Sequence, residues 1–184
     1  MALHKIALIG GGVILMAALG LLPAFLHEKN GGIIALDRPV SSLNAQFADK
    51  EYLMVFVGYV GCRDVCSPRL ESLSRIYTEL EAERKQKSGV LFIDFAPEGD
   101  PEQAERFARY FNGAFAGISA DKTRRQELRR ELDIYFSTDT ARPNEYNHSD
   151  YLYLLKKEQG GWHLRGVLTG SRWQLDDLDY LFSL

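Results

Sequence analysis

The stretch VFVGYVGCRDVCSPRL, residues 55–70, holds both cysteines of a 184-residue chain. Apolar, β-favouring residues lead into Cys62, and after Cys66 the apolar residues recur at helical spacing. A buried strand that runs into a helix is the building unit of an α/β sheet, and sites in such sheets form where the strands end. The stretch therefore predicts a strand–helix junction that places two thiols at the functional edge of a sheet.

The rest of the chain repeats this alternation. Apolar runs at 89–95 and 114–119 predict buried strands, and amphipathic patterns predict helices over 67–80, 100–112, 120–136 and 171–183. Two strands joined by KKEQGG then predict a late hairpin over 151–168. Ser67, Asp100 and Ser171 are expected as helix caps. The pattern predicts the α/β class, with a thioredoxin-like sheet flanked by helices.

The first residues differ in character from the rest. Residues 6–26 carry no charge and are long enough to cross a bilayer as a helix. A cleaved signal peptide is the alternative, but the one small-x-small site, 18–20, lies inside the apolar run. Lys5 precedes the run and favours export of the residues beyond it. We expect a transmembrane anchor at 1–29, a tether at 30–50 with a short strand at 33–36, and a folded domain at 51–184.

An exported domain of this charge has few reasons to bind nucleic acid. Residues 30–184 hold 20 of the 22 Lys and Arg and 24 of the 25 Asp and Glu, a net charge of about −4. We therefore expect no nucleic-acid partner and a location in a bacterial inner membrane, single-pass, with the domain facing the periplasm or outer side. The four arginines over 124–130 alternate with acidic residues, and we interpret them as a solvated helix face.

The spacing of the cysteines separates two uses. Amides at a helix N-terminus and the neighbouring Arg63 should make both sulfurs more acidic than a free cysteine. Three intervening residues in a helical turn put the Cβ atoms ~5–6 Å apart, whereas a disulfide wants ~3.5–4.5 Å. The wider spacing suits two thiolates on one soft metal ion, Cu(I) or zinc. A disulfide across so small a loop would contribute little stability.

A metal site would need more ligands than two thiolates. Of the four histidines, His4 and His27 flank the apolar run, and His163 sits in the last predicted strand. His148 lies in a polar loop that leads into a strand, where a lone histidine is also common as an ordinary surface residue. Composition alone leaves the two interpretations of His148 open.

Several segments resemble the Sco/SenC family. GYVGCRDVCSPRL is similar to the family's F-G-F-T-x-C-P-x-x-C-P-x-x-L segment, and YNHSDYLYLL, IDFAPEGDPEQ and AFAGIS resemble three further family stretches. The resemblance covers roughly residues 50–184. It implies a membrane-anchored, thioredoxin-like copper protein of cytochrome oxidase assembly, with Cys62, Cys66 and His148 as the copper ligands. It also implies Asp94 and Asn147 as candidates for groups behind the ligands, although Asp94 is equally well interpreted as an ordinary acid at the end of a strand.

The chain departs from the family pattern without losing a ligand. Arg63 and Ser67 stand where the family has proline, and Asn147 stands where it usually has aspartate. The resemblance implies a divergent metallochaperone that carries Cu(I) or Cu(II) to a cytochrome oxidase subunit or another exported copper or thiol protein. The alternative is a membrane-anchored thiol–disulfide reductase that uses the same two cysteines, with Cys62 as the attacking thiol.

Overall fold

The computed structural model describes residues 32–142 and 145–184. Within that part of the chain, no helix combines the length and the apolar character that a membrane crossing requires. The anchor expected from residues 6–26 lies outside the described residues and stays a prediction. Residues 32–184 belong to one compact unit.

From residue 52 to residue 132, strands alternate with helical segments, as the apolar pattern predicts. In chain order the elements are β1 (Ile33–Val40), β2 (Tyr52–Gly58), α2 (Cys66–Glu79), α3 (Ala82–Lys87), β3 (Ser88–Asp94), α4 (Pro101–Phe111), β4 (Ala116–Ser119), α5 (Lys122–Leu132), β5 (Phe136–Thr138), β6 (Tyr146–His148), β7 (Leu152–Glu158), β8 (Gly161–Leu168) and α6 (Leu175–Phe182).

One mixed sheet organises the unit. Its strand order is β1-β8-β7-β2-β3-β4, and a separate two-stranded ribbon is formed by β5 and β6. The strands β2, β3 and β4 run parallel, whereas the pairs β2–β7, β7–β8 and β8–β1 are antiparallel. The central strands β2 and β3 are buried along nearly their whole length, which explains why their sequences are continuous apolar runs.

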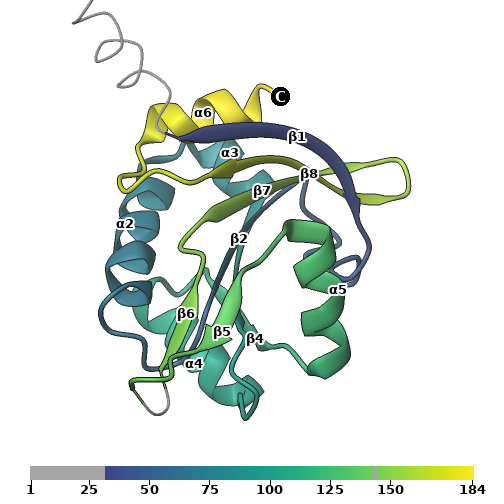
Figure 1. The fold of residues 1–184 in the computed structure, drawn as a ribbon. Helices are drawn as coiled ribbons and strands as arrows, with labels where there is room; N and C mark the ends of the chain where they lie inside the picture. The colour runs from purple at the N-terminus through teal and green to yellow at the C-terminus, as the bar shows by residue number, and fades with distance from the viewer. Residues whose placement is uncertain (1–31, 143–144) are drawn as a thin grey trace, which may run out of the picture. The chain divides into compact units, whose positions relative to one another are not determined.

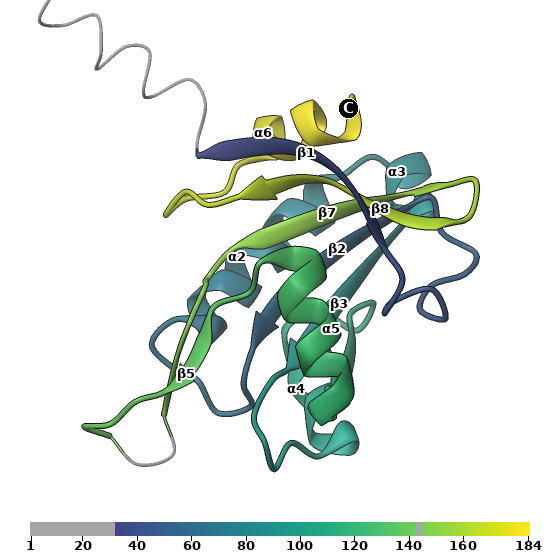
Figure 2. The ribbon, with the colours of Figure 1, turned by 45° about the vertical axis from the view of Figure 1, so that its right-hand side comes forward.

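Helices cover both faces of the sheet. Figures 1 and 2 show α5 on one side and α2, α3 and α4 on the other. Leu128 and Leu132 of α5 and Leu70 and Leu73 of α2 are buried. The last helix, α6, adjoins α3 through the ion pair between Arg84 and Asp179. The sheet is therefore shielded from water on both sides, as an α/β fold requires.

Two of the three predicted helix caps are wrong. Asp100 caps α4 as expected, accepting a hydrogen bond from the Glu102 amide at 2.9 Å. The helix α2, however, starts at Cys66, so Ser67 lies inside its first turn, where its hydroxyl donates to the Cys62 carbonyl at 3.0 Å. The cap of α6 is Gln174 rather than Ser171, because the chain is still irregular over 169–174.

Two other segments also differ from the prediction. The helix expected over 120–136 ends at Leu132, because Asp133 takes a left-handed conformation with φ of 53°. The polar segment that leads to His148 contains the ribbon of β5 and β6 in place of a simple loop. Alternating apolar residues were too few in either short strand to indicate it.

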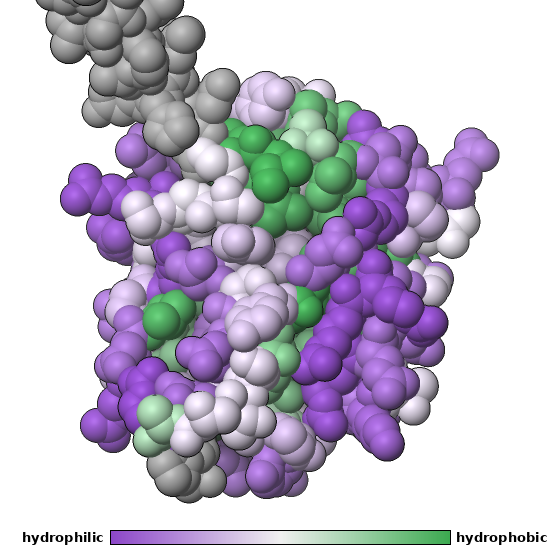
Figure 3. Space-filling view, in the orientation of Figure 1, coloured by the Kyte–Doolittle hydropathy of each residue, from purple (hydrophilic) through white to green (hydrophobic). Residues whose placement is uncertain are grey.

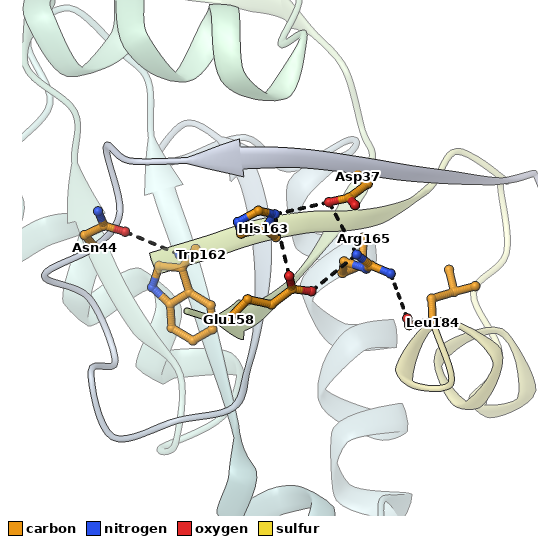
Figure 4. Close-up of polar contacts among 7 residues, drawn as sticks. All are labelled: Asp37, Asn44, Glu158, Trp162, His163, Arg165 and Leu184. Carbon is orange, nitrogen blue, oxygen red and sulfur yellow. Dashed lines mark hydrogen bonds and ion pairs between the residues drawn. The ribbon is translucent and has the colours of Figure 1, made fainter. Parts of the chain in front are cut away.

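The edge strand β1 is longer than the four residues expected, and it occupies part of the segment interpreted as a tether. It pairs with β8 along Ile33–Val40, with an irregularity between Ala35 and Arg38. Figure 4 shows how polar groups reinforce this edge: Asp37 of β1 accepts from the His163 ring at 3.1 Å and pairs with Arg165 at 3.3 Å. Arg165 in turn donates to the carbonyl of Leu184 at 2.8 Å. His163 thus serves the sheet edge.

Candidate metal centre

The junction after β2 folds the two cysteines toward each other. Gly61 supplies a left-handed turn with φ of 90°, which few residues with a side chain adopt. The Cys66 amide then donates to the Cys62 sulfur at 3.3 Å, and the Ser67 amide donates to the Cys62 carbonyl at 3.3 Å. Cys62 therefore sits just before α2, at its positive end, and Cys66 is its first residue.

His148 reaches the same place from the ribbon of β5 and β6. It ends β6 and pairs with Phe136 of β5, whose ring stacks on the imidazole with centroids 6.1 Å apart. The Tyr59 ring meets the imidazole edge-on at 5.8 Å. The Nδ1 atom lies 3.0 Å from the Ser149 carbonyl, so we assign the ring proton to Nδ1. The unprotonated Nε2 then faces the sulfurs.

The three side chains form a compact donor set. His148 Nε2 lies 3.8 Å from Cys62 Sγ and 3.4 Å from Cys66 Sγ, and all three ligand atoms lie within 4.8 Å of one another. A sulfur and a nitrogen bound to one ion at about 2.3 and 2.0 Å would be roughly 3.5–3.8 Å apart in tetrahedral or trigonal geometry. Both cysteines are free. The two sulfur–nitrogen distances thus fit a shared metal ion.

The two thiols differ sharply in acidity. A hydrogen bond from Cys66, together with contacts from His148 and backbone amides, outweighs burial and lowers the pKa of Cys62 to about 4. Burial raises the pKa of Cys66 well above its usual value, as does the neighbouring Cys62. The expectation that both sulfurs are unusually acidic is therefore right for Cys62 and wrong for Cys66. One thiolate at a time suits this enclosed site, because two adjacent negative charges repel.

The pKa values of the two neighbouring rings, His148 and Tyr59, are shifted as well. Burial by itself lowers the pKa of His148, but contacts with Cys62 and the Ser149 carbonyl raise it on balance above the usual value. Burial and the Cys62 charge raise the pKa of Tyr59 to about 12, so its hydroxyl stays neutral. A Cys62 thiolate thus favours the charged form of His148 and disfavours the charged form of Tyr59.

The remaining predicted residues lie around the donor set. Asp94 ends β3 and is buried; its carboxylate accepts from the Ala96 amide at 3.0 Å, and burial raises its pKa. Asn147 and the exposed Arg63 line a cavity of about 370 Å³ that also contains Cys62 and His148. Neither Asp94 nor Asn147 belongs to the donor set. His4 and His27 lie outside the described residues.

Sequence reasoning missed the groups that position the donors. A Cβ atom at Gly58 would clash with Cys66 Sγ, and a lone glycine inside a buried strand could have indicated such a close approach. Arg69, one turn after Cys66, pairs with Asp150, donates to the Ser171 carbonyl at 2.6 Å and lies over the Trp173 ring at 4.8 Å. The contacts of Arg69 connect the residues after His148 to α2, and no local sequence pattern predicts them.

The order of the segments and the geometry of the donor set agree with a comparison against known families. The sequence profile described as SCO1/SenC matches residues 39–174, most of the chain. The chain belongs to the SCO1/SenC family. The predicted family is confirmed, and the strand–helix junction, the ribbon and His148 all lie within the matched residues.

Individual SCO1/SenC relatives are distant. A putative copper-binding protein of Stutzerimonas stutzeri is 27% identical over 105 residues, which are 55% of this chain and 52% of that protein. The chain spans about half or less of the length of the first curated relatives that it matches.

Solved structures of the family share the fold. The apo Sco1 protein of Thermus thermophilus superposes with a TM-score of 0.55 at 23% identity, covering 84% of this chain and 88% of that one. Arabidopsis thaliana ScoI with copper bound gives 0.61 at 18% identity, covering 83% and 96%. This likeness confirms the predicted thioredoxin-like α/β fold.

Proposed function

We propose that this SCO1/SenC protein binds copper through Cys62, Cys66 and His148 and transfers it to a copper site in a respiratory oxidase. The observation that carries the proposal is the donor set itself: two sulfurs and one imidazole nitrogen within 4.8 Å, with the nitrogen facing both sulfurs. The related proteins whose descriptions name copper make copper the first metal to test.

The chemistry of the donors suits copper in both oxidation states. Soft thiolates select Cu(I), and imidazole is a good ligand for Cu(II). Cys62 is already a thiolate at neutral pH, so only Cys66 must lose a proton when the ion binds. A partner's thiolates would enter through the cavity that Cys62 and His148 line and take over the ion by ligand exchange.

A thiol–disulfide reductase is a second candidate, and the difference in acidity between the thiols favours it. Cys62, with a pKa of about 4, would be the attacking thiolate, and Cys66 would be the resolving thiol held protonated behind it. Its partner would be an exported protein with cysteines to reduce. A pure dithiol reductase has no need of His148 as a donor.

Metal titration tests the donor set. Reduced protein should bind one copper per chain, and Cys62→Ser or Cys66→Ser should abolish tight Cu(I) binding, because a hydroxyl is a poor ligand for a soft ion. His148→Ala should weaken Cu(II) binding by more than the 10–100-fold typical of groups behind the ligands. Full copper retention by Cys66→Ser would exclude a two-thiolate site.

Complementation of a deletion strain separates the two functions. His148→Ala that folds normally, still reduces a model disulfide and yet fails to restore oxidase activity would support metal delivery. Full restoration by the same variant would favour the reductase. Added copper should rescue the variant in the first case only, because excess metal replaces a weakened carrier but supplies no reductant.

The proposal includes a location. Residues 1–29 would anchor the protein in a bacterial inner membrane, residues 30–50 would lead into the domain, and residues 51–184 would face the periplasm or outer side. Membrane, oxidase subunit and copper are then the expected partners. The support is the uncharged run at 6–26 followed by a domain whose two thiols suit an exported copper carrier.

A further inference from the structure

A second cavity, of about 280 Å³, lies between α5 and β5, and positive charge dominates its lining. Its polar lining consists of Lys122, Arg125, Gln126, Arg129, Ser137 and Thr138, and its apolar side of Phe95, Pro97, Phe136 and Tyr146. Among the described residues, three cations and no acidic side chain line this cavity. Figure 3 shows the strongly hydrophilic surface over α5.

The fold separates charges that alternate in the sequence. Glu131 turns away from the cavity and accepts from the hydroxyl and amide of Ser41 at 2.7 and 3.0 Å. Asp133 pairs with Arg38 at 2.8 Å. Lys122, Arg125 and Arg129 recur at helical spacing on the cavity side, and within the described residues none of the three forms an ion pair with a carboxylate. Lys122 and Arg129 are exposed, as the prediction of a solvated face requires, but Glu131 and Asp133 do not balance the charge on this side of α5.

The arginines are held in place rather than free to move. Arg125 donates from one nitrogen to the carbonyls of Ala96 and Ala120, at 3.2 and 2.8 Å. Arg129 donates to the Phe136 carbonyl at 2.7 Å. Each guanidinium has five N–H donors, so donors remain for a ligand. Because backbone carbonyls already fix the side chains, a ligand would cost little additional side-chain entropy.

We propose that this cavity binds a small phosphate-type dianion, either inorganic phosphate or a phosphate monoester. Guanidinium groups match phosphate oxygens in a fork geometry, and a lysine adds a point charge. A phosphate group carries about −1.5 to −2 charges at pH 7, so it balances three cations better than a single carboxylate. The Ser137 and Thr138 hydroxyls offer further donors. The apolar side, with the Phe136 and Tyr146 rings stacked at 4.9 Å, would accept the organic part of an ester.

Two acidic groups close to the lining, Glu98 and Asp94, leave room for this ligand. Glu98 lies outside the lining and accepts from the Tyr146 hydroxyl at 3.3 Å. Asp94 is buried beneath the strand end, and although it feels the charge of Arg125, these two described residues form no ion pair. The cavity also touches the ribbon that carries His148, because Phe136 lies in both places. The proposed anion site does not require bound copper, and anion binding can be measured without metal.

Calorimetry of the metal-free full chain in a non-ionic detergent tests the proposal. Inorganic phosphate, glycerol phosphate and acetate are titrated at constant ionic strength set with chloride. We expect saturable binding of one phosphate per chain and much weaker binding of acetate. Equal or tighter binding of glycerol phosphate would assign the site to a phosphorylated molecule, and binding of inorganic phosphate alone would assign it to the free anion.

Variants of one helix supply the control. Arg125→Gln with Arg129→Gln should weaken phosphate binding about 10–100-fold or more, as expected for lost charge-assisted hydrogen bonds. Lys122→Gln should weaken it about 2–5-fold; this side chain makes no hydrogen bond within the described residues, so the variant carries little folding risk. Arg124→Gln with Arg130→Gln removes the same charge from outside the cavity and should bind as wild type.

Two results would overturn the site. One is the absence of saturable phosphate binding to the folded wild-type chain up to about 10 mM, well above a typical small-ligand range. The other is an equal loss of affinity in the control pair, which would show that only the net charge of α5 matters. A melting curve for each variant verifies that the domain is folded in every titration.

Discussion

Replacing Gly58 by alanine should disable the metal centre while leaving all three proposed ligands in the chain. The new Cβ would lie closer to Cys66 Sγ than real Cβ atoms come to their neighbours. The Phe92 ring, 3.4 Å from the new Cβ, prevents it from moving away in that direction. To restore a contact of at least 3.4 Å, the sulfur or the strand must move by about an ångström. Metal–ligand distances tolerate only about ±0.2 Å.

That displacement should change both stability and metal affinity. Overpacking a buried position costs about 1–3 kcal/mol, so the metal-free reduced protein should unfold at lower urea. Affinity for Cu(I), measured by competition with a chelator, should fall by at least 10–100-fold, as for other disturbances of a site's support.

The chain offers a matched control. Gly113→Ala adds the same methyl group at a place where no atom lies within 4 Å of the new Cβ, so it should leave copper affinity unchanged and stability equal or slightly higher. If Gly58→Ala kept the copper affinity and the stability of the wild type, as the control should, the close contact of β2 with Cys66 would be refuted.

Three further predictions concern acidity, packing and location. Between pH 4 and 6 the thiol of Cys62 is ionised only in the folded state. The unfolding free energy of the reduced, metal-free protein should therefore rise with pH relative to that of Cys62→Ser, by up to about 1.4 kcal/mol per pH unit. If the two proteins gave parallel plots of unfolding free energy against pH, the low pKa of Cys62 would be contradicted. Arg69→Gln should lower the free energy of unfolding in urea by about 2–3 kcal/mol, because it leaves the partly buried Asp150 carboxylate without its partner. Arg106→Gln, which removes an exposed ion pair, should lower it by only about 0.3–0.5 kcal/mol. The full chain should stay in the membrane fraction with residues 6–26 intact, and a mature N-terminus after residue 20 would show cleavage instead.

Local patterns predicted the elements whose character depends on neighbours in the chain. The continuous apolar run before Cys62 became the central strand β2, and Asp100 with Pro101 marked the start of α4 correctly. The same reasoning failed at the helix after the cysteines, because Ser67 is used to bind the Cys62 carbonyl instead of capping the helix. Whether a hydroxyl caps a helix depends on where the first turn begins, and the packing of the junction decided that.

The acidity of the two thiols is a second property that position along the chain was insufficient to predict. Both cysteines lie near the start of α2, which alone would lower both pKa values. Burial separates them: Cys62 borders a cavity and receives hydrogen bonds, whereas Cys66 is fully enclosed beneath it. The difference in desolvation has no counterpart in the sequence, because it depends on which side of the turn faces solvent.

The amino-acid order alone was enough to predict the α/β class, the junction that carries the two thiols and, through the resemblance of several segments, the SCO1/SenC family. Hydrophobic periodicity and the order of motifs can be recognised in the chain without knowledge of long-range contacts. The amino-acid order does not reveal that His148 Nε2 faces both sulfurs, or that Glu131 and Asp133 turn away from Arg125 and Arg129. Those outcomes join groups more than 80 residues apart or sort neighbours onto opposite helix faces, and they arise from the packing of the whole sheet.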